Sequence, residues 1–254
     1  MSVITIVLCI VSFLAGLIDS ISGGGGLLLI PSLLIAGLPP HMVLGTNKFA
    51  ATIGTSVALF NFIRNKKVIW KIAVHGIVFA LAGSFIGTKT ILSFDNRIVG
   101  KIIVFLLPLA ILVTLIPRKN LPEKEKDFSK ADLYLKVPLV CFVLGFYDGF
   151  FGPGTGSLFV LFLFVFLGTN LVHASATSKV FNAVSNLGAL VPFIMAGKVI
   201  YLLGIPLALC NIGGNYLGSH LTITRGGKVV RSFLVISLLI LLVTLIWQYF
   251  INES

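Results

Sequence analysis

The stretch Gly16–Leu29, GLIDSISGGGGLLL, decides the fold because it returns later in the chain as Gly145–Leu158, GFYDGFFGPGTGSL. Both stretches place an aspartate and a run of glycines at the end of an apolar segment. At one constant offset the matched residues are Gly16 and Gly145, Asp19 and Asp148, Gly23 and Gly152, and Gly25 and Gly154. The sequence therefore predicts an internal duplication.

The duplication continues beyond the glycines and covers nearly the whole chain. After a two-residue shift in the offset, the matched residues are Thr46 and Thr177, Lys48 and Lys179, Lys67 and Lys198, Gly83 and Gly214, Gly87 and Gly218, and Arg97 and Lys228. Self-similarity of this length is typical of transporters built from two structural repeats. We expect a first membrane repeat at 1–116, a linker at 117–136 and a second membrane repeat at 137–254.

The composition indicates a protein embedded in lipid. Of the 254 residues, 57% are hydrophobic and only 11% are charged, whereas soluble domains carry roughly a quarter charged residues. The net charge of +11 comes mostly from lysines and arginines in short loops, where basic residues orient a membrane protein instead of binding nucleic acid. The first apolar run lacks a basic leader, so we expect it to be retained and not cleaved as a signal peptide. The expected partner is the lipid bilayer, not nucleic acid.

Apolar runs bounded by charge, glycine or proline predict the helices. The runs lie at 3–20, 26–37, 44–63, 70–89, 98–116, 137–150, 156–168, 175–195, 200–221 and 232–250. Most are about 20 residues long and can cross the ~30 Å hydrocarbon core, but 26–37 and 156–168 are too short. The predicted fold is an all-α integral membrane protein with two homologous, inverted repeats. Each repeat has a glycine-broken short half-helix followed by three spanning helices, about eight hydrophobic helices in all besides the half-helices.

The loop charges favour inverted over parallel repeats. If each short run turns back within the membrane, thirteen basic residues lie on one side and four on the other. If each unit crosses an even number of times, the counts are eleven and six. The positive-inside rule prefers the more uneven distribution. We therefore expect the linker in the cytoplasm and both termini outside.

Four charged residues fall inside otherwise uncharged stretches: Asp19, Lys48, Asp148 and Lys179. A charge at the bilayer centre costs at least ~2.5–3.5 kcal/mol, so these residues need a reason to be there. On one hypothesis the lysines bind an anion while the aspartates handle coupling protons or orient the site. On the other, two Asp–Lys ion pairs hold each glycine break to the next helix and have no role in binding. The sequence leaves both open.

The glycine stretches are a further feature that favours an anion. Glycine lets the backbone turn sharply and approach a ligand, and the helix that follows directs unpaired N–H groups and its positive dipole end toward the break. The alternative is that the glycines serve close helix packing. The predicted substrate-binding residues are Gly23, Gly24, Gly25, Gly26, Asn47, Lys48, Gly152, Gly154, Thr155, Gly156, Ser178, Lys179 and Asn182, with Asp19 and Asp148 as candidate coupling residues.

The sequence contains no pattern that is typical of an enzyme. Hydrolase serine, HExxH zinc and GKS phosphate-binding motifs are missing, and the four histidines and three cysteines show no metal-ligand spacing. We expect no catalytic residue, no metal ion and no cofactor.

Two long segments, 16–48 and 145–190, resemble the TauE/SafE family of sulfite and organosulfonate exporters, also called the toluene sulfonate uptake permease (TSUP) family. They read GLIDSISGGGGLLLIPSLLIAGLPPHMVLGTNK and GFYDGFFGPGTGSLFVLFLFVFLGTNLVHASATSKVFNAVSNLGAL. Segment 145–190 is most similar to the YfcA-like branch. The resemblance implies a multi-pass protein of the bacterial cytoplasmic (inner) membrane that moves small sulfur-containing or related organic anions. It also implies a site at the glycine stretches and at the TNK and TSK segments, 46–48 and 177–179.

The sequence thus predicts a secondary transporter that moves a small anion, such as sulfite or a sulfonate, by alternating access. A passive anion channel and a non-transporting membrane scaffold subunit are the alternatives. The identity of the anion, the direction of transport, the coupling ion and the oligomeric state, including a homo-oligomer, stay open.

Overall fold

The computed structural model describes residues 3–114 and 128–226, and within them the chain is helical and contains no strand. The helices are α1 (Val3–Ser22), α2 (Gly26–Ile35), α3 (Pro40–Arg64), α4 (Trp70–Leu92), α5 (Asn96–Thr114), α6 (Val137–Phe150), α7 (Thr155–Leu161), α8 (Leu171–Met195) and α9 (Tyr201–Arg225). Two π-helical segments continue them, Asp132–Lys136 ahead of α6 and Phe162–Phe166 after α7.

The predicted apolar runs coincide with these helices, apart from 232–250, which lies outside the described residues. The largest differences are at the starts of α3 and α8, which begin before the apolar runs at 44 and 175, and at the end of α9, which continues to Arg225 beyond the run that ends at 221. Capping explains the two starts. Pro40 occupies the first turn of α3, where its missing N–H costs nothing, and the side chain of Asn170 accepts a hydrogen bond from the His173 N–H at 2.9 Å to start α8.

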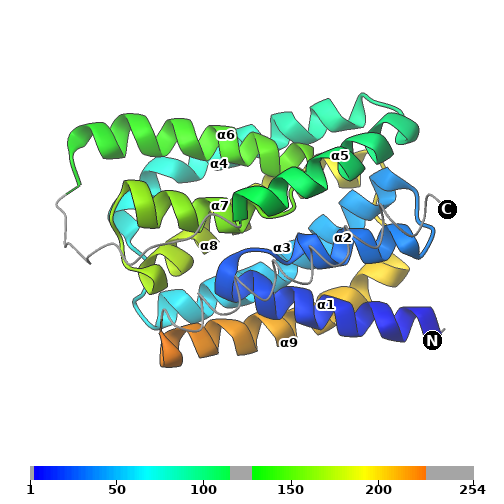
Figure 1. Cartoon of the computed structure of the whole chain (residues 1–254), viewed down its shortest axis with the longest axis horizontal. Coiled ribbons are helices and arrows are strands. Elements are labelled where there is room, and N and C mark those ends of the chain that lie inside the picture. Colours follow the sequence, from blue (N-terminus) through cyan, green and yellow to red (C-terminus); the bar gives the residue numbers. More distant parts are fainter. Residues whose placement is uncertain (1–2, 115–127, 227–254) are drawn as a thin grey trace.

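The helices pack in a crossed pattern between the N-terminal and C-terminal halves (Figure 1). Helix α1 packs against α9, and α6 packs against α4, while α3 and α8 contact each other and also α9 and α4 respectively. The α1–α9 and α4–α6 pairs are closely packed through glycine. A Cβ on Gly83 would overlap the carbonyl oxygen of Phe142, and one on Gly214 would overlap that of Phe13. Because these glycines have no side chain, the two helix backbones can approach closely and gain van der Waals contacts.

Many polar side chains are buried inside the bundle beside the apolar core, and many large apolar side chains are exposed on its outside, unlike in a soluble protein. Exposed residues include Ile35 and Leu202, at 82% and 90% exposure, whereas Lys179 and Asn215 are fully buried. Among residues 3–114 and 128–226, three helical stretches are long and apolar enough to cross a bilayer: Val3–Ser22, Trp70–Leu92 and Asp132–Phe150. Shorter apolar helices occupy 26–35 and 155–166, as the sequence predicted. This distribution fits a protein whose outer surface faces lipid.

Candidate functional site

The two glycine stretches end α1 and α6 and meet in the interior of the bundle. Gly23 and Gly152 have φ angles of 84° and 95°, a left-handed backbone that only glycine adopts without strain. Ser157, in the first turn of α7, ties one stretch to the other. Its N–H donates to the Gly23 carbonyl at 3.0 Å, and its hydroxyl donates to the Ser22 carbonyl at 2.7 Å. The backbone breaks of the two halves are therefore in direct contact.

Each buried lysine forms an ion pair with the aspartate of the other half. Lys48 Nζ lies 2.8 Å from Asp148 Oδ1, and Lys179 Nζ lies 3.0 Å from Asp19 Oδ2. Ion pairs were one of the two hypotheses from sequence, but there they held a break to the next helix of the same half. The observed pairs instead join α3 to α6 and α8 to α1.

The Lys48–Asp148 pair is almost completely buried, and each member has a further hydrogen-bond partner. Lys48 also donates to Asn186 Oδ1 at 2.9 Å, and the Ser185 hydroxyl donates to Asp148 Oδ2 at 2.7 Å. The Lys48 and Asp148 side chains are 4% and 2% exposed. A buried charge pair needs such additional partners because burial removes the water that solvated both groups.

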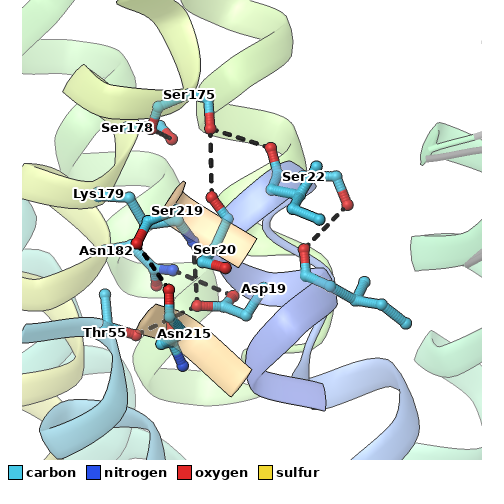
Figure 2. A network of polar contacts seen from close by, with 12 residues as sticks. Asp19, Ser20, Ser22, Thr55, Ser175, Ser178, Lys179, Asn182, Asn215 and Ser219 are labelled. Carbon is cyan, nitrogen blue, oxygen red and sulfur yellow. Dashed lines mark hydrogen bonds and ion pairs between the residues drawn. The ribbon is translucent and has the colours of Figure 1, made fainter. Parts of the chain in front are cut away.

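The Lys179–Asp19 pair has longer contacts and one more open member. Besides Lys179, Asp19 accepts a hydrogen bond from the Thr55 hydroxyl at 3.2 Å and one from Asn182 Nδ2 at 3.5 Å. Figure 2 shows these groups converging from α3 and α8 on Asp19 of α1. Lys179 is fully buried, whereas the Asp19 side chain is 15% exposed.

A cavity with about 420 Å³ of empty space, part of it open to the surroundings, lies where the breaks and the ion pairs meet. Its walls come from both halves and combine glycines, amides and charges. The lining residues are Ala15, Asp19, Gly23, Gly25, Gly26, Leu29, Asn47, Lys48, Ala51, Asp148, Gly152, Gly154, Gly156, Asn182, Asn186 and Asn211. Most residues of the predicted site are therefore brought together around one space.

Four predicted residues do not line this cavity. Gly24 faces Leu27, Ile18 and Ser157. The hydroxyls of Thr155 and Ser178 donate to the nearby carbonyls of Gly152 and Ser175, at 2.8 Å each.

Lys179, the fourth, is fully buried and pairs with Asp19, which does line the cavity.

Two polar lining residues, Asn186 and Asn211, were missing from the predicted site. Asn186 stands one helical turn after Asn182 on α8, and its Nδ2 donates to Asn182 Oδ1 at 3.3 Å. The four-residue spacing places both on one face of the helix, and this signal is readable from sequence. Asn211 on α9 has no such neighbour within the predicted set, so only the α1–α9 packing places it at the site.

The site is electrostatically balanced without a ligand. Two ammonium groups face two carboxylates, and four asparagines add amide donors and acceptors around them. Within residues 3–114 and 128–226, no cluster of three or more His, Cys, Asp or Glu side chains has the arrangement of a metal site. The chemistry available is reversible binding of a small polar or anionic solute.

Residues 8–245 match the sulfite exporter TauE/SafE family. The chain belongs to this family. Curated TauE/SafE relatives include a "probable membrane transporter protein" of Haemophilus influenzae, 39% identical over 91% of this chain and 89% of its own length. Another relative is the "probable membrane transporter protein YfcA" of Escherichia coli K12, which is 37% identical over 91% of this chain and 85% of its own length. A third, the "probable membrane transporter protein ORF9" of a Sinorhizobium species, is 34% identical over 90% of this chain and 87% of its own length.

The resemblance to the YfcA-like branch is thereby confirmed. These relatives are named as transporters and not as enzymes. No solved structure matched the chain.

Proposed function

We propose that this TauE/SafE protein is a secondary transporter that moves a small anion through the cavity between its two halves by alternating access. The observation that carries the proposal is Lys48, a buried ammonium group that lines a cavity inside the helix bundle. Ionisable groups at this depth are costly and usually belong to a substrate or ion path. The glycine breaks on both sides of the cavity let backbone amides approach the solute.

The anion is small and compatible with sulfite or a sulfonate. The family's name supports a sulfur oxyanion, and the cavity offers matching groups. The Lys48 ammonium supplies charge, and Asn47, Asn182, Asn186 and Asn211 supply amide donors that can distribute over several oxygens. Because Asp148 already neutralises Lys48, an arriving anion must compete with or share that ammonium group.

Reciprocal contacts support two inverted repeats. The Thr177 hydroxyl accepts from the Ile69 N–H at 3.0 Å, and the Thr46 hydroxyl accepts from the Ile200 N–H at 3.1 Å. Both members of one contact match those of the other at the same sequence offset. In Figure 1, α1 runs into the bundle from the end marked N, whereas α6 enters from the opposite end. One half is thus upside down relative to the other, the geometry in which halves exchange conformations to alternate access.

The distribution of basic residues supports a cytoplasmic linker in the inner membrane. Parallel packing of α3 with α9, and of α4 with α6, brings one set of helix ends together. Among the described residues, that end carries Arg64, Lys66, Lys67, Lys71, Lys130, Lys136 and Arg225, and the other carries Lys89, Arg97, Lys101 and Lys198. The positive-inside rule assigns the first end to the cytoplasm.

A transport assay with a matched lysine control tests the proposal. Purified protein is first screened by thermal shift against sulfite, thiosulfate, methanesulfonate and simple carboxylates, because a ligand of the folded state raises the melting temperature. Counterflow of the stabilising anion is then measured in proteoliposomes for wild type, Lys48→Ala and Lys136→Ala. Lys136 pairs with Asp132 at 2.7 Å on the surface, so its loss should leave transport intact.

The result expected is saturable counterflow that Lys48→Ala abolishes and Lys136→Ala preserves. Equal counterflow in Lys48→Ala would remove this lysine from the site. Flux without saturation or counterflow would identify a passive channel, and no flux with any anion would leave a scaffold.

A further inference from the structure

We propose that Asp19 is the group that takes up a proton when the anion binds, and that this proton arrives from the basic end through a row of buried polar side chains. The row consists of Thr55, Asn215, Ser219 and Asn61, of which Asn61 is partly exposed. The two hydroxyls pass the proton, whereas the two amides hold the hydroxyls and water in place. The inference rests on the proposed function and deepens it, since it makes the protein a proton–anion symporter and distinguishes two carboxylates that the sequence treats alike.

The two carboxylates differ in how firmly they are held as anions. Asp148 is 2% exposed and receives hydrogen bonds of 2.7 and 2.8 Å from Ser185 and Lys48. Asp19 is 15% exposed and its contacts are 3.0 Å or longer. Short charge-assisted hydrogen bonds stabilise the ionised form. Asp19 is therefore the more loosely held and the more accessible of the two carboxylates.

A polar row leads from Asp19 toward the basic end between α3 and α9. Thr55 donates to Asp19 at 3.2 Å, Ser219 donates to the Asn215 carbonyl at 2.7 Å, and Asn61 Nδ2 donates to Ser219 at 3.0 Å. Figure 2 shows Thr55, Asn215 and Ser219 on the same side of Asp19. Thr55, Asn215 and Ser219 are fully buried, while Asn61 is partly exposed one turn before Arg64.

One oxygen in this row calls for a mobile donor. Asn215 Oδ1 is buried and accepts no hydrogen bond from any described residue. A buried amide oxygen is normally paired with protein or water. A water molecule at Asn215 Oδ1 would join the Thr55 and Ser219 hydroxyls, which can each donate and accept and so pass a proton along.

The matching positions around Asp148 differ at the end of the row. At the sequence offset that relates Lys48 to Lys179, Thr55 matches Asn186, Asn215 matches Ser84 and Ser219 matches Thr88, whereas Asn61 matches Pro192. Pro192 and its neighbour Phe193 are buried. The Asp148 side thus lacks the last polar group of the row, the amide that donates to Ser219 on the Asp19 side.

Charge balance links the proton to the anion. Asp19 is faced by Lys179 from α8 and, across the cavity, by Lys48 from α3 and Asp148 from α6; among the described residues no other charged group lines this space. These four charges sum to zero, so one anion alone leaves the site at −1. A proton that adds to an Asp19 oxygen breaks no covalent bond and restores neutrality, and it frees Lys179 to attract the anion. Each ligand thus favours the other.

The experiment measures proton and anion movement together. Wild-type, Asp19→Asn and Asp132→Asn proteins are reconstituted in vesicles that contain a pH-sensitive dye, and methanesulfonate is added outside. This monovalent anion keeps its charge through the neutral range, and Asp132 pairs with Lys136 outside the cavity. Wild type and Asp132→Asn should acidify the lumen as the anion enters. Asp19→Asn should lose acidification and retain equilibrium exchange of the anion.

Variants of the row residues give a second test that does not depend on Asp19→Asn folding correctly. Thr55→Val and Ser219→Ala keep both ion pairs and should lose most of the acidification rate while anion exchange continues, and Thr88→Val is the matched control on the other side. Acidification at the wild-type rate in Asp19→Asn, or in both row variants, would overturn the inference. Anion uptake by wild type without acidification would do the same and leave the proposed function standing. No anion movement at all would refute both.

Discussion

Lys48 Nζ and Asp148 Oδ1 lie 2.8 Å apart, although one belongs to α3 in the first half of the chain and the other to α6 in the second. The same arrangement recurs between Lys179 and Asp19. Each half therefore completes the charge balance of the other. A single half, folded alone, would bury one lysine and one aspartate without these partners, which is a strong reason for the two halves to fold together.

The Lys48–Asp148 pair should show strong coupling in a double-mutant cycle. Lys48→Ala leaves Asp148 buried and unpaired, so we expect a loss of about 3–5 kcal/mol in the free energy of unfolding. Asp148→Ala should cost a comparable amount. The double variant should be more stable than either single one, because no charge is left without a partner. Thermal unfolding in detergent of wild type, the two single variants and the double variant measures these changes in stability.

Anion binding, measured on the same variants, distinguishes the effect of the ion pair on stability from its effect on function. The double variant should stay unresponsive to anions that raise the melting temperature of wild type, because its cavity lacks the ammonium group. Independent, additive effects of the two substitutions would contradict the ion pair, and recovery of anion binding in the double variant would contradict the role of Lys48.

Much of the fold was readable from sequence because its signals are local. The lengths of the apolar runs predicted the short helices α2 and α7, and the glycines after Asp19 and Asp148 predicted the breaks ahead of them. Helix starts were less accurate where capping decided them, as at Asn170. Burial of Lys48 and Lys179 followed from their uncharged surroundings.

The partners in the site were not readable, because they depend on how distant helices cross. Spacing along the chain cannot tell whether Lys48 meets Asp19 of its own half or Asp148 of the other. The same limit applies to Lys179, which pairs with Asp19 of the other half and is not among the residues that line the cavity. Asn211 reaches the cavity only because α9 packs beside α1.

Gly23 and Gly37 form a matched pair for testing the glycine break. Their φ angles are 84° and 83°, so alanine at either position adopts a strained left-handed backbone at about 1–2 kcal/mol. A Cβ on Gly37 meets no atom within 4 Å, whereas one on Gly23 would overlap the backbone of Gly156. Gly23→Ala should therefore cost roughly 1–3 kcal/mol more and abolish transport.

The comparison isolates the contact between the two breaks. Gly37→Ala should transport normally with a slightly lower melting temperature. If both variants lose the same stability and the same transport, backbone strain alone accounts for the glycines, and their contact has no separate role.

Thr46 and Thr177 should be equivalent in their effect on stability. Each hydroxyl accepts a hydrogen bond from a backbone N–H of the other half, at 3.1 and 3.0 Å. Valine at either position leaves that N–H unpaired at a cost of about 1–3 kcal/mol, while serine keeps the hydroxyl and serves as the control. Melting temperatures of the four variants would test this, and a large effect at one position with none at the other would weigh against equivalent halves.

The inverted arrangement can be tested at Asn65 and Ala196. Asn65 directly follows α3, and Ala196 directly follows α8. Both residues are exposed and occupy matched positions of the two halves. Cysteine is introduced at one or the other after Cys9, Cys141 and Cys210 have been replaced by serine. Asn65 lies beside Arg64 and Lys66, so the positive-inside rule puts it in the cytoplasm. A membrane-impermeant maleimide should then label Ala196→Cys in intact cells and Asn65→Cys only after lysis. Labelling of both from the same side would mean parallel repeats, and the crossed ion pairs could then not be explained by an upside-down second half.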